Sequence, residues 1–419
     1  MSPRRSLLFF VALAVGTTAC SSDESATSPT TTPEPTASTA VTEATTAATT
    51  TTPTTEPAPT TTLDLATLAS TYAERGPYPV GVATYTLDKG PSVEIWYPAV
   101  EGTSGSVSYD ARDLVPLAIR EILTADIPAS FTFDGARDAA AADGTFPVVL
   151  FSHGLAGFRL QSSFLTSHLA SWGFVVAAPD HPSRDLRNVL SATASGERAD
   201  SVDDLLQTLD LVIAQADDPA SVLSGRVDAD HVVAVGHSAG GGTILSAALD
   251  ARVDGYVSLA SGVLVGDPAA STTTVEGDAG LPDKPSFFMA GSEDRVISAQ
   301  DRTKPSFESV PEPSLLWVID GVGHNGFDDF CTFGGGTGII GIAEASGLGG
   351  LLDAQPQLRA LGEDGCIPPA VPVTETFPMI RHGVTAWIRN LFGIDAEPIG
   401  IGPEFADAFA RPVEIDTRP

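Results

Sequence analysis

Residues 231–245 read HVVAVGHSAGGGTIL, a run of apolar residues followed by a glycine-rich turn and a second apolar run. The valine-rich residues 231–235 suit a buried parallel strand. Residues 239–249 combine small and apolar side chains, as in a helix that packs closely on a sheet. Glycines are needed in the turn between them because side chains there would clash with neighbouring backbone. The pattern predicts a strained strand-to-helix turn with Ser238 exposed at its tip as a candidate nucleophile; an ordinary glycine-rich turn is the alternative.

Apolar runs of strand length recur along the chain and alternate with amphipathic segments. The expected strands cover residues 93–97, 147–152, 174–178, 231–235, 255–259, 286–290 and 315–319. The expected helices cover residues 161–172, 202–216, 239–249 and 377–391. Strands and helices in alternation predict an α/β fold with a mostly parallel central sheet and helices on both faces.

The residue types that serine catalysis requires each follow a separate expected strand. A serine nucleophile needs a base that takes its proton and an acid that orients the base. Ser238, Asp294 and His324 supply these groups, in the order serine, acid, histidine along the chain. Because the carboxyl ends of parallel strands meet at one edge of a sheet, we expect the three side chains to form a catalytic triad.

The sequence also contains other carboxylates and histidines. Four aspartates are alternatives to Asp294 as the triad acid: Asp267, Asp320, Asp328 and Asp329. The remaining histidines are better explained as turn or packing residues: His153, His168, His181, His231, His237 and His382.

A tetrahedral intermediate also needs backbone donors for its oxyanion. The amide of Ala239 follows the nucleophile directly, and the amide of Leu155 lies in a loop after the expected strand 147–152. Gly154 and Gly157 allow that loop to approach the site closely. We expect the amides of Leu155 and Ala239 to form the oxyanion hole.

Four motifs together resemble a known group of enzymes. They are VEIWYPA at 93–99, FSHGLAGFR at 151–159, LASWGFVVAAPDH at 169–181 and HNGFDDF at 324–330. This set is similar to the platelet-activating-factor acetylhydrolase family and its dienelactone-hydrolase-like and bacterial cutinase relatives. The resemblance implies the α/β-hydrolase fold and a carboxylic-ester hydrolase.

The chain departs from the acetylhydrolases at the position of the triad acid. In that family the acid follows the strand after the nucleophile helix, where this chain has Leu259, Ala260 and Ser261. Residues 291–294 (GSED) instead resemble the dienelactone-hydrolase and cutinase arrangement. The phospholipid substrate is therefore not carried over.

The first 62 residues differ in composition from the rest. Residues 1–20 have the layout of an export signal, and residues 17–22 resemble a bacterial lipobox in which Cys20 would become lipid-modified. Residues 21–62 contain 18 Thr and 6 Pro, which favours a disordered tether. We expect residues 63–419 to form the catalytic domain of an exported protein, either a cell-envelope lipoprotein or a secreted one.

Lipidation of Cys20 would leave Cys331 and Cys366 to form a disulfide, and two free thiols are the alternative. The glycine-rich residues 331–366 between them follow His324. They fit either a cap over the site or a plain surface insertion.

The net charge of −31, from 53 acidic and 22 basic residues, argues against nucleic acid or anionic membranes as partners. The sequence has no metal-ligand spacing, so we expect no metal and no cofactor. A lipid anchor would be the protein's sole membrane contact, and we expect a monomer.

These features predict an exported serine esterase or lipase-like carboxylesterase that acts on a small-molecule, lipid or polyester substrate through an acyl-enzyme on Ser238. The alternatives are an acetylhydrolase-like phospholipase, a cutinase-like polyester hydrolase, or a catalytically idle surface lipoprotein that binds ligands. We expect the pocket, and with it the acyl specificity, to depend on residues 100–146, 180–200 and 331–366.

Overall fold

The computed structural model describes residues 64–262 and 281–419, which all belong to the compact unit Thr61–Pro419. The expected signal peptide, Cys20, the tether and Asp267 lie outside the described residues. Within the described ranges, no helix is long and apolar enough to cross a membrane.

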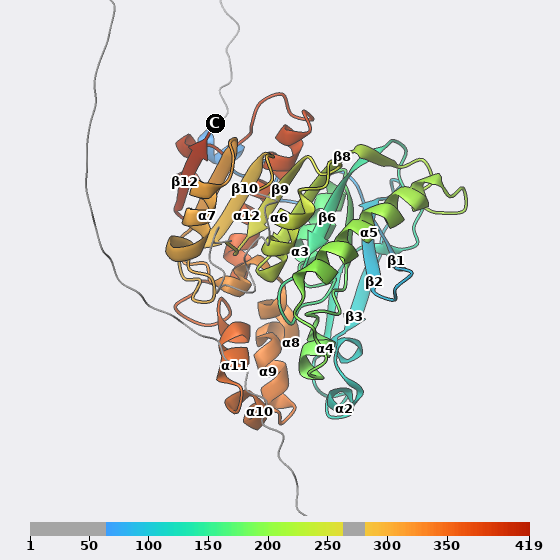
Figure 1. The fold of residues 1–419 in the computed structure, drawn as a ribbon, viewed down its shortest axis with the longest axis vertical. Helices are drawn as coiled ribbons and strands as arrows, with labels where there is room; N and C mark the ends of the chain where they lie inside the picture. Colours follow the sequence, from blue (N-terminus) through green and yellow to red (C-terminus); the bar gives the residue numbers. More distant parts are fainter. Residues whose placement is uncertain (1–63, 263–280) are drawn as a thin grey trace, which may run out of the picture. The chain divides into compact units, whose positions relative to one another are not determined.

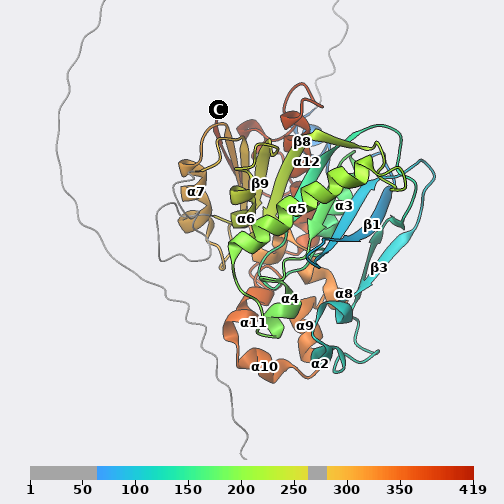
Figure 2. The ribbon, with the colours of Figure 1, turned by 45° about the vertical axis from the view of Figure 1, so that its right-hand side comes forward.

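A ten-stranded sheet forms the centre of the domain, in the order β12-β11-β10-β9-β8-β6-β7-β2-β1-β5 (Figures 1 and 2). Its strands are β1 (Val80–Thr86), β2 (Ser92–Pro98), β5 (Ala136–Arg137), β6 (Phe146–Ser152), β7 (Val175–Pro179), β8 (Val227–His237), β9 (Gly255–Leu259), β10 (Ser286–Gly291), β11 (Ser314–Ile319) and β12 (Val413–Arg418). The six strands from β7 to β11 in that order are parallel, whereas β1 with β2, β2 with β7 and β11 with β12 pair antiparallel. The prediction of a mostly parallel sheet is confirmed.

Helices cover both faces of this sheet. One face packs against α3 (Ser163–Ser171) and α12 (Val373–Leu391), and the other against α5 (Arg198–Asp217), α6 (Ala239–Ala247) and α7 (Lys304–Ser309). Shorter helices are α1 (Leu65–Leu68), α2 (Leu117–Arg120) and α4 (Leu186–Leu190). A separate hairpin pairs β3 (Ser106–Asp110) with β4 (Ser130–Asp134).

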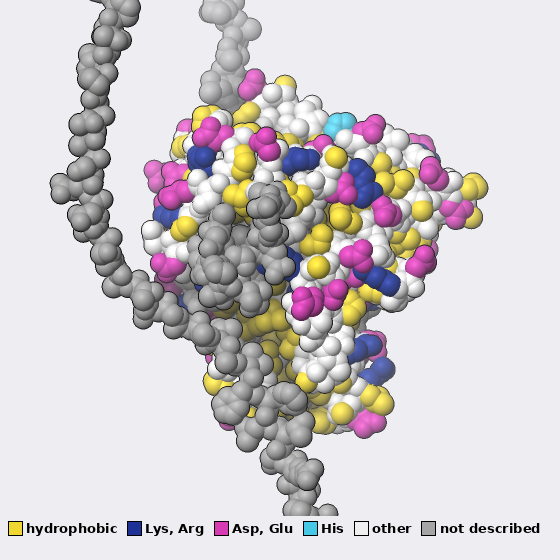
Figure 3. Space-filling model, in the orientation of Figure 1, with side chains coloured by type: hydrophobic (Ala, Val, Ile, Leu, Met, Phe, Trp, Pro, Cys, Tyr) yellow, Lys and Arg dark blue, Asp and Glu magenta, His cyan; other side chains and the backbone are white. Residues whose placement is uncertain are grey.

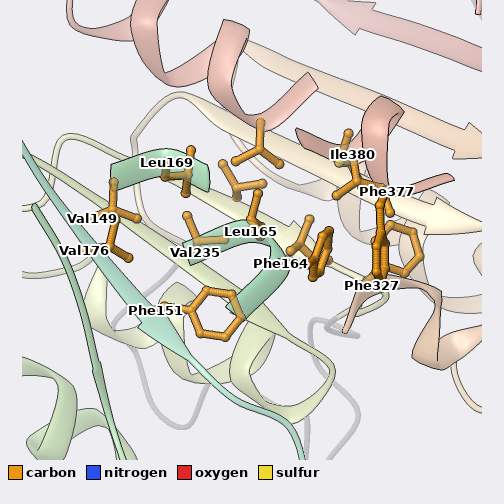
Figure 4. Packing of buried hydrophobic residues seen from close by; sticks show 14 of the residues in the cluster. Val149, Phe151, Phe164, Leu165, Leu169, Val176, Val235, Phe327, Phe377 and Ile380 are labelled. Carbon is orange, nitrogen blue, oxygen red and sulfur yellow. The ribbon is translucent and has the colours of Figure 1, made fainter. Parts of the chain in front are cut away.

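The core follows from the alternation of side chains along the central strands. On β6 and β8, Val149, Phe151 and Val235 face α3 and α12, whereas Val148 and Leu150 face α5 and α6. Figure 4 shows the first of these layers, where Phe164 of α3 stacks on Phe377 of α12 with ring centroids 3.9 Å apart. Both faces of the strands are buried, which explains their nearly continuous apolar sequence.

Residues 331–366, here called the cap, project from one end of the domain below the sheet in Figure 1. The cap contains α8 (Phe333–Gly336), α9 (Gly338–Ala345), α10 (Gly349–Asp353) and α11 (Pro356–Glu363). A disulfide between Cys331 and Cys366 closes its base. In both ribbon views the cap lies beside α2 and α4.

Candidate active site

Ser238 sits at a strained turn between β8 and α6. Its φ is +55° and its ψ is −121°, a conformation that L-residues rarely adopt. A Cβ added to Gly236 would lie 2.4 Å from the carbonyl oxygen of Gly240, and a Cβ added to Gly240 would lie 2.0 Å from that of Ser152. Both glycines are therefore required by close backbone approaches, and the turn directs the Ser238 hydroxyl toward the carboxyl edge of the sheet.

Ser238, His324 and Asp294 form a hydrogen-bonded chain. His324 Nε2 lies 2.9 Å from Ser238 Oγ, and His324 Nδ1 lies 2.9 Å from Asp294 Oδ2. Asp294 follows β10 and His324 follows β11, so neighbouring parallel strands bring the three residues to one edge. With its proton on Nδ1, His324 donates to Asp294 and accepts from the Ser238 hydroxyl, as a general base requires.

Charge around His324 favours its protonated form. Burial opposes protonation, but the carboxylate of Asp294, with smaller effects of Asp328 and Asp364, raises the pKa of His324 above its usual value. Asp294 is itself fixed by the amides of Val296 and Ile297, which donate to its Oδ1 over 2.9 and 2.7 Å. The arrangement can stabilise an imidazolium formed during catalysis.

The alternative acids have other partners. Asp320 pairs with Arg411 over 3.2 Å. Asp329 accepts a hydrogen bond from the amide of Phe164 near the start of α3, and burial raises the pKa of Asp329 to about 7. The structure thus brings Asp294, and neither of these, to His324.

The amides of Leu155 and Ala239 both lie beside the nucleophile. Ala239 is the first residue of α6, where the leading amides of a helix have no helical acceptor. Within the described residues neither amide donates a hydrogen bond. A Cβ added to Gly154 would lie 3.1 Å from the Cβ of Ser238, so the Leu155 loop passes directly against Ser238. Both amides are therefore available to an oxyanion formed there.

Gln161 holds this loop in place, a role that the sequence analysis missed. Its Oε1 accepts from the amide of Gly154 over 3.0 Å, and its Nε2 donates to Asp328 Oδ2 over 2.9 Å. The same Nε2 lies 2.7 Å from Nδ1 of His237, whose Nε2 lies 3.1 Å from the carbonyl oxygen of His324. These contacts require neutral His237, and burial lowers its pKa well below the usual value. The network links the Leu155 loop to the His324 loop.

Asp364, at the end of the cap, was also missed. Its carboxylate accepts from the amide of His324 over 2.7 Å and from that of Arg295 over 3.0 Å. Its carbonyl oxygen accepts from the amide of Asn325 over 3.0 Å. One cap residue therefore binds the two loops that carry His324 and Asp294.

A second Ser-His-Asp chain lies behind the site. Ser152 Oγ is 2.9 Å from His181 Nε2, and His181 Nδ1 is 3.0 Å from Asp204 Oδ2. Ser152 and His181 are fully buried, Asp204 is almost so, and Ser152 also accepts from Arg184 over 2.8 Å. None of these residues lines the cavity described next, so the geometry serves packing here and not access to substrate.

A cavity opens above Ser238, with an empty volume of about 1040 Å³ including its open mouth. Its walls come from residues 111–123, from α4 and from the cap, which fall within the three segments expected to shape the pocket. Ser238, His324 and Leu155 lie at its floor. Among residues 64–262 and 281–419, no cluster of three or more His, Cys, Asp or Glu side chains could hold a metal ion.

Comparisons with known proteins bear on the fold of this chain and on its resemblance to the acetylhydrolases. The family model of platelet-activating factor acetylhydrolase, isoform II, matches residues 71–206, which include the Leu155 loop and end before Ser238. A ferulic acid esterase from Streptomyces cinnamoneus is similar in structure, with a TM-score of 0.54, 20% identity, and coverage of 75% of this chain and 90% of that one. The protein has the α/β-hydrolase fold and resembles the acetylhydrolase group, as the sequence predicted.

Proposed function

We propose that the protein is an exported serine carboxylic-ester hydrolase that works through an acyl-enzyme on Ser238. The observation that carries the proposal is the hydrogen-bonded chain of Ser238, His324 and Asp294 at the floor of an open cavity. The acetylhydrolase match and the esterase neighbour are consistent with it. Export, by secretion or by a lipid anchor on Cys20, is proposed from the sequence alone, as is the monomeric state.

In the proposed mechanism, Ser238 Oγ attacks the ester carbonyl carbon while His324 Nε2 takes the hydroxyl proton. The carbonyl oxygen becomes an oxyanion that accepts from the amides of Leu155 and Ala239. Collapse of the intermediate breaks the bond to the alcohol, which leaves with the proton from His324. Water then gives its proton to His324 and attacks the acyl-enzyme, which releases the carboxylic acid and restores Ser238.

The test is hydrolysis of p-nitrophenyl esters by the purified full-length protein and its Ser238→Ala variant. We expect the replacement to lower turnover by several orders of magnitude, because the hydroxyl is the attacking group. A serine-reactive fluorophosphonate should label the wild type and leave the variant unlabelled. Equal turnover by both proteins would refute the mechanism, and an unlabelled, inactive wild type would favour a ligand-binding lipoprotein.

Acetylhydrolase-like phospholipid cleavage is a second candidate, favoured by the family match over residues 71–206. Within the described residues 260–262 no carboxylate follows β9, whereas Asp294 follows β10 and lies 2.9 Å from His324. This supports an acid in the position expected from the resemblance to dienelactone hydrolases and cutinases. Cutinase-like polyester cleavage is therefore the other candidate within the class. Release of acetate from an sn-2 acetyl phospholipid, compared with release of acid from a polyester film, would separate them.

A further inference from the structure

The cavity above Ser238 has aliphatic walls on every side. Residues 111–123 contribute Val115, Ile119 and Leu123 at intervals of four, and α4 contributes Leu186 and Leu190. The cap contributes isoleucines and leucines from α9, α10 and α11. Phe330 is the only Phe, Tyr or Trp among the described residues that line the cavity. Walls of this composition favour a hydrocarbon chain as the ligand.

Polar groups are confined to the end of the cavity at the nucleophile. No Asp, Glu, Lys or Arg among the described residues lines it. The polar lining residues are Gln161, His237, Ser238, His324 and Asn325. Gln161, His237 and His324 use their donors and acceptors within the site, and Asn325 Nδ2 donates to the carbonyl oxygens of Leu361 and Asp364 over 2.7 and 2.8 Å. A ligand can therefore form hydrogen bonds near Ser238 and loses those of any polar group placed farther from Ser238, between the aliphatic walls.

Apolar surface inside this cavity is open to solvent. Leu155, beside the nucleophile, is 49% exposed, and Leu351 of α10 is 41% exposed, although both line the cavity. Leu117 of α2, in the same segment as Val115 and Ile119, is 70% exposed but does not line the cavity. Figure 3 shows hydrophobic side chains exposed over the lower part of the domain, where Figure 1 places the cap and α2. Contiguous apolar surface of this kind is typical of a binding site.

The charged side chains of the cap lie outside the cavity lining. Arg359 of α11 pairs with Glu344 and Glu363 over 2.8 and 2.9 Å, and none of these three residues lines the cavity. The cap is thus amphipathic, with its aliphatic side chains turned toward Ser238. This polarity is expected for a segment that covers a hydrocarbon ligand and is not required of a plain surface insertion.

We propose, on the basis of the esterase function above, that the cavity is an acyl site for esters of long aliphatic acids. The acyl chain would run from Ser238 between residues 111–123, α4 and the cap, and only the ester group would meet polar atoms. Each methylene that enters the site should improve binding by about fourfold, so kcat/KM should rise with chain length. An ester of a hydroxycinnamic acid should be a poor substrate, because its phenolic hydroxyl would find no partner in the aliphatic part of the site.

The test compares acetyl, butanoyl, octanoyl and dodecanoyl p-nitrophenyl esters at concentrations where they are monomeric. We expect kcat/KM of the wild type to rise about 16-fold from acetyl to butanoyl, which adds two methylenes, and to keep rising through octanoyl to dodecanoyl. Ala343→Phe, which places a ring in the cavity from α9, should abolish that rise. Ala345→Phe is the matched control, because Ala345 is an exposed residue of the same helix that does not line the cavity.

A measurement on the wild type alone keeps the proposal testable if Ala343→Phe does not fold. A dodecyl fluorophosphonate should label Ser238 faster than an ethyl fluorophosphonate does. Turnover of the acetyl ester with no gain for longer esters, or equal labelling by both probes, would overturn the acyl site and leave the esterase function standing. No turnover of any ester together with no labelling would overturn the esterase function, and the acyl site with it.

Discussion

Ser238 and Ser152 show what separates a nucleophile from a structural serine in this domain. Each hydroxyl lies 2.9 Å from a histidine Nε2, and each histidine has an aspartate partner. Ser238 differs because it lines the cavity and lies beside two unused amides. Access and the oxyanion site, more than the triad geometry alone, therefore identify the candidate catalytic residue.

The first prediction uses Ser152 as the control for Ser238. Ser152→Ala should keep fluorophosphonate labelling, because Ser238 and its partners are untouched. It should lower the free energy of unfolding by about 1–3 kcal/mol, since His181 and Arg184 lose a buried partner. Labelling and urea denaturation of both variants check this, and loss of labelling in folded Ser152→Ala would contradict it.

The second prediction concerns Gln161 as a positioning residue. Gln161→Met keeps the volume and removes the hydrogen bond to the amide of Gly154, so the Leu155 amide loses its fixed position. We expect kcat to fall by about 10- to 100-fold with little change in KM, within the loss caused by removing one oxyanion donor. Gln207→Met, which breaks a bond to Asp203 on α5, is the control. A change confined to KM would show that Gln161 shapes the pocket instead.

The third prediction follows from the raised pKa of His324. Only neutral His324 can accept the serine proton, so kcat/KM should decrease as the pH falls through that pKa. Burial disfavours the imidazolium, but Asp294, Asp328 and Asp364 raise the pKa of His324, so the midpoint should lie above about 6.5. Asp294→Asn should lower kcat by about 10³- to 10⁴-fold and shift the midpoint to lower pH. An unshifted midpoint in that variant would contradict the assignment.

Secondary structure and site were predictable to different extents. Expected strand 255–259 coincides with β9. The ends of the other six expected strands differ from the observed ends by at most two residues, except that β8 begins four residues earlier than expected. This agreement arises because buried parallel strands have continuous apolar sequences. The strands β1, β3, β4, β5 and β12 were not predicted, since their exposed positions interrupt that signal. Gln161 and Asp364 were missed because their partners lie far away in sequence, a relation that local patterns do not contain.

Among the elements, the helices of the cap were the hardest to predict, because tertiary contacts hold them in place. Its glycines give weak helix signals, and Gly334 and Gly335 adopt positive φ within α8. The Cys331–Cys366 disulfide and the packing of Ile342 and Leu352 hold its helices against the domain. The sequence could therefore mark the boundaries of the cap through its cysteines but not its helices.

The fourth prediction tests the disulfide. Replacement of Cys331 and Cys366 by serine should lower the free energy of unfolding by about 2–4 kcal/mol, because the unfolded chain gains freedom. Turnover should fall as well, since Asp364 lies two residues from Cys366 and binds the amide of His324. Denaturation and ester assays measure both effects, and reduction of the wild type by dithiothreitol should reproduce them. Unchanged stability in the double variant would show that packing alone holds the cap.

At the scale of the whole molecule, the acidic charge is the dominant long-range feature. With 53 acidic and 22 basic residues, the acidic side chains outnumber the basic ones by 31. Their mutual repulsion disfavours the compact state. The ten-stranded sheet with buried apolar layers on both faces offsets this repulsion.

The fifth prediction is that salt stabilises the protein. Raising NaCl from about 10 to 200 mM shortens the Debye length from about 30 Å to below 10 Å, which screens repulsion across the surface. We expect Tm to rise over this range, as differential scanning calorimetry can measure. A falling Tm would show that the surface ion pairs, such as that of Arg252 with Asp210, outweigh the repulsion.

The contacts of Asp364 have a consequence for exchanging caps between related enzymes. A cap chosen to accept a different acid would replace the walls of the site and, with them, the residue that fixes the backbone of His324 and Arg295. A chimera that grafts a foreign segment between Cys331 and Cys366 should therefore lose rate on every substrate unless it retains an aspartate at position 364. The cap would therefore determine both which substrates bind and whether His324 is correctly placed for catalysis.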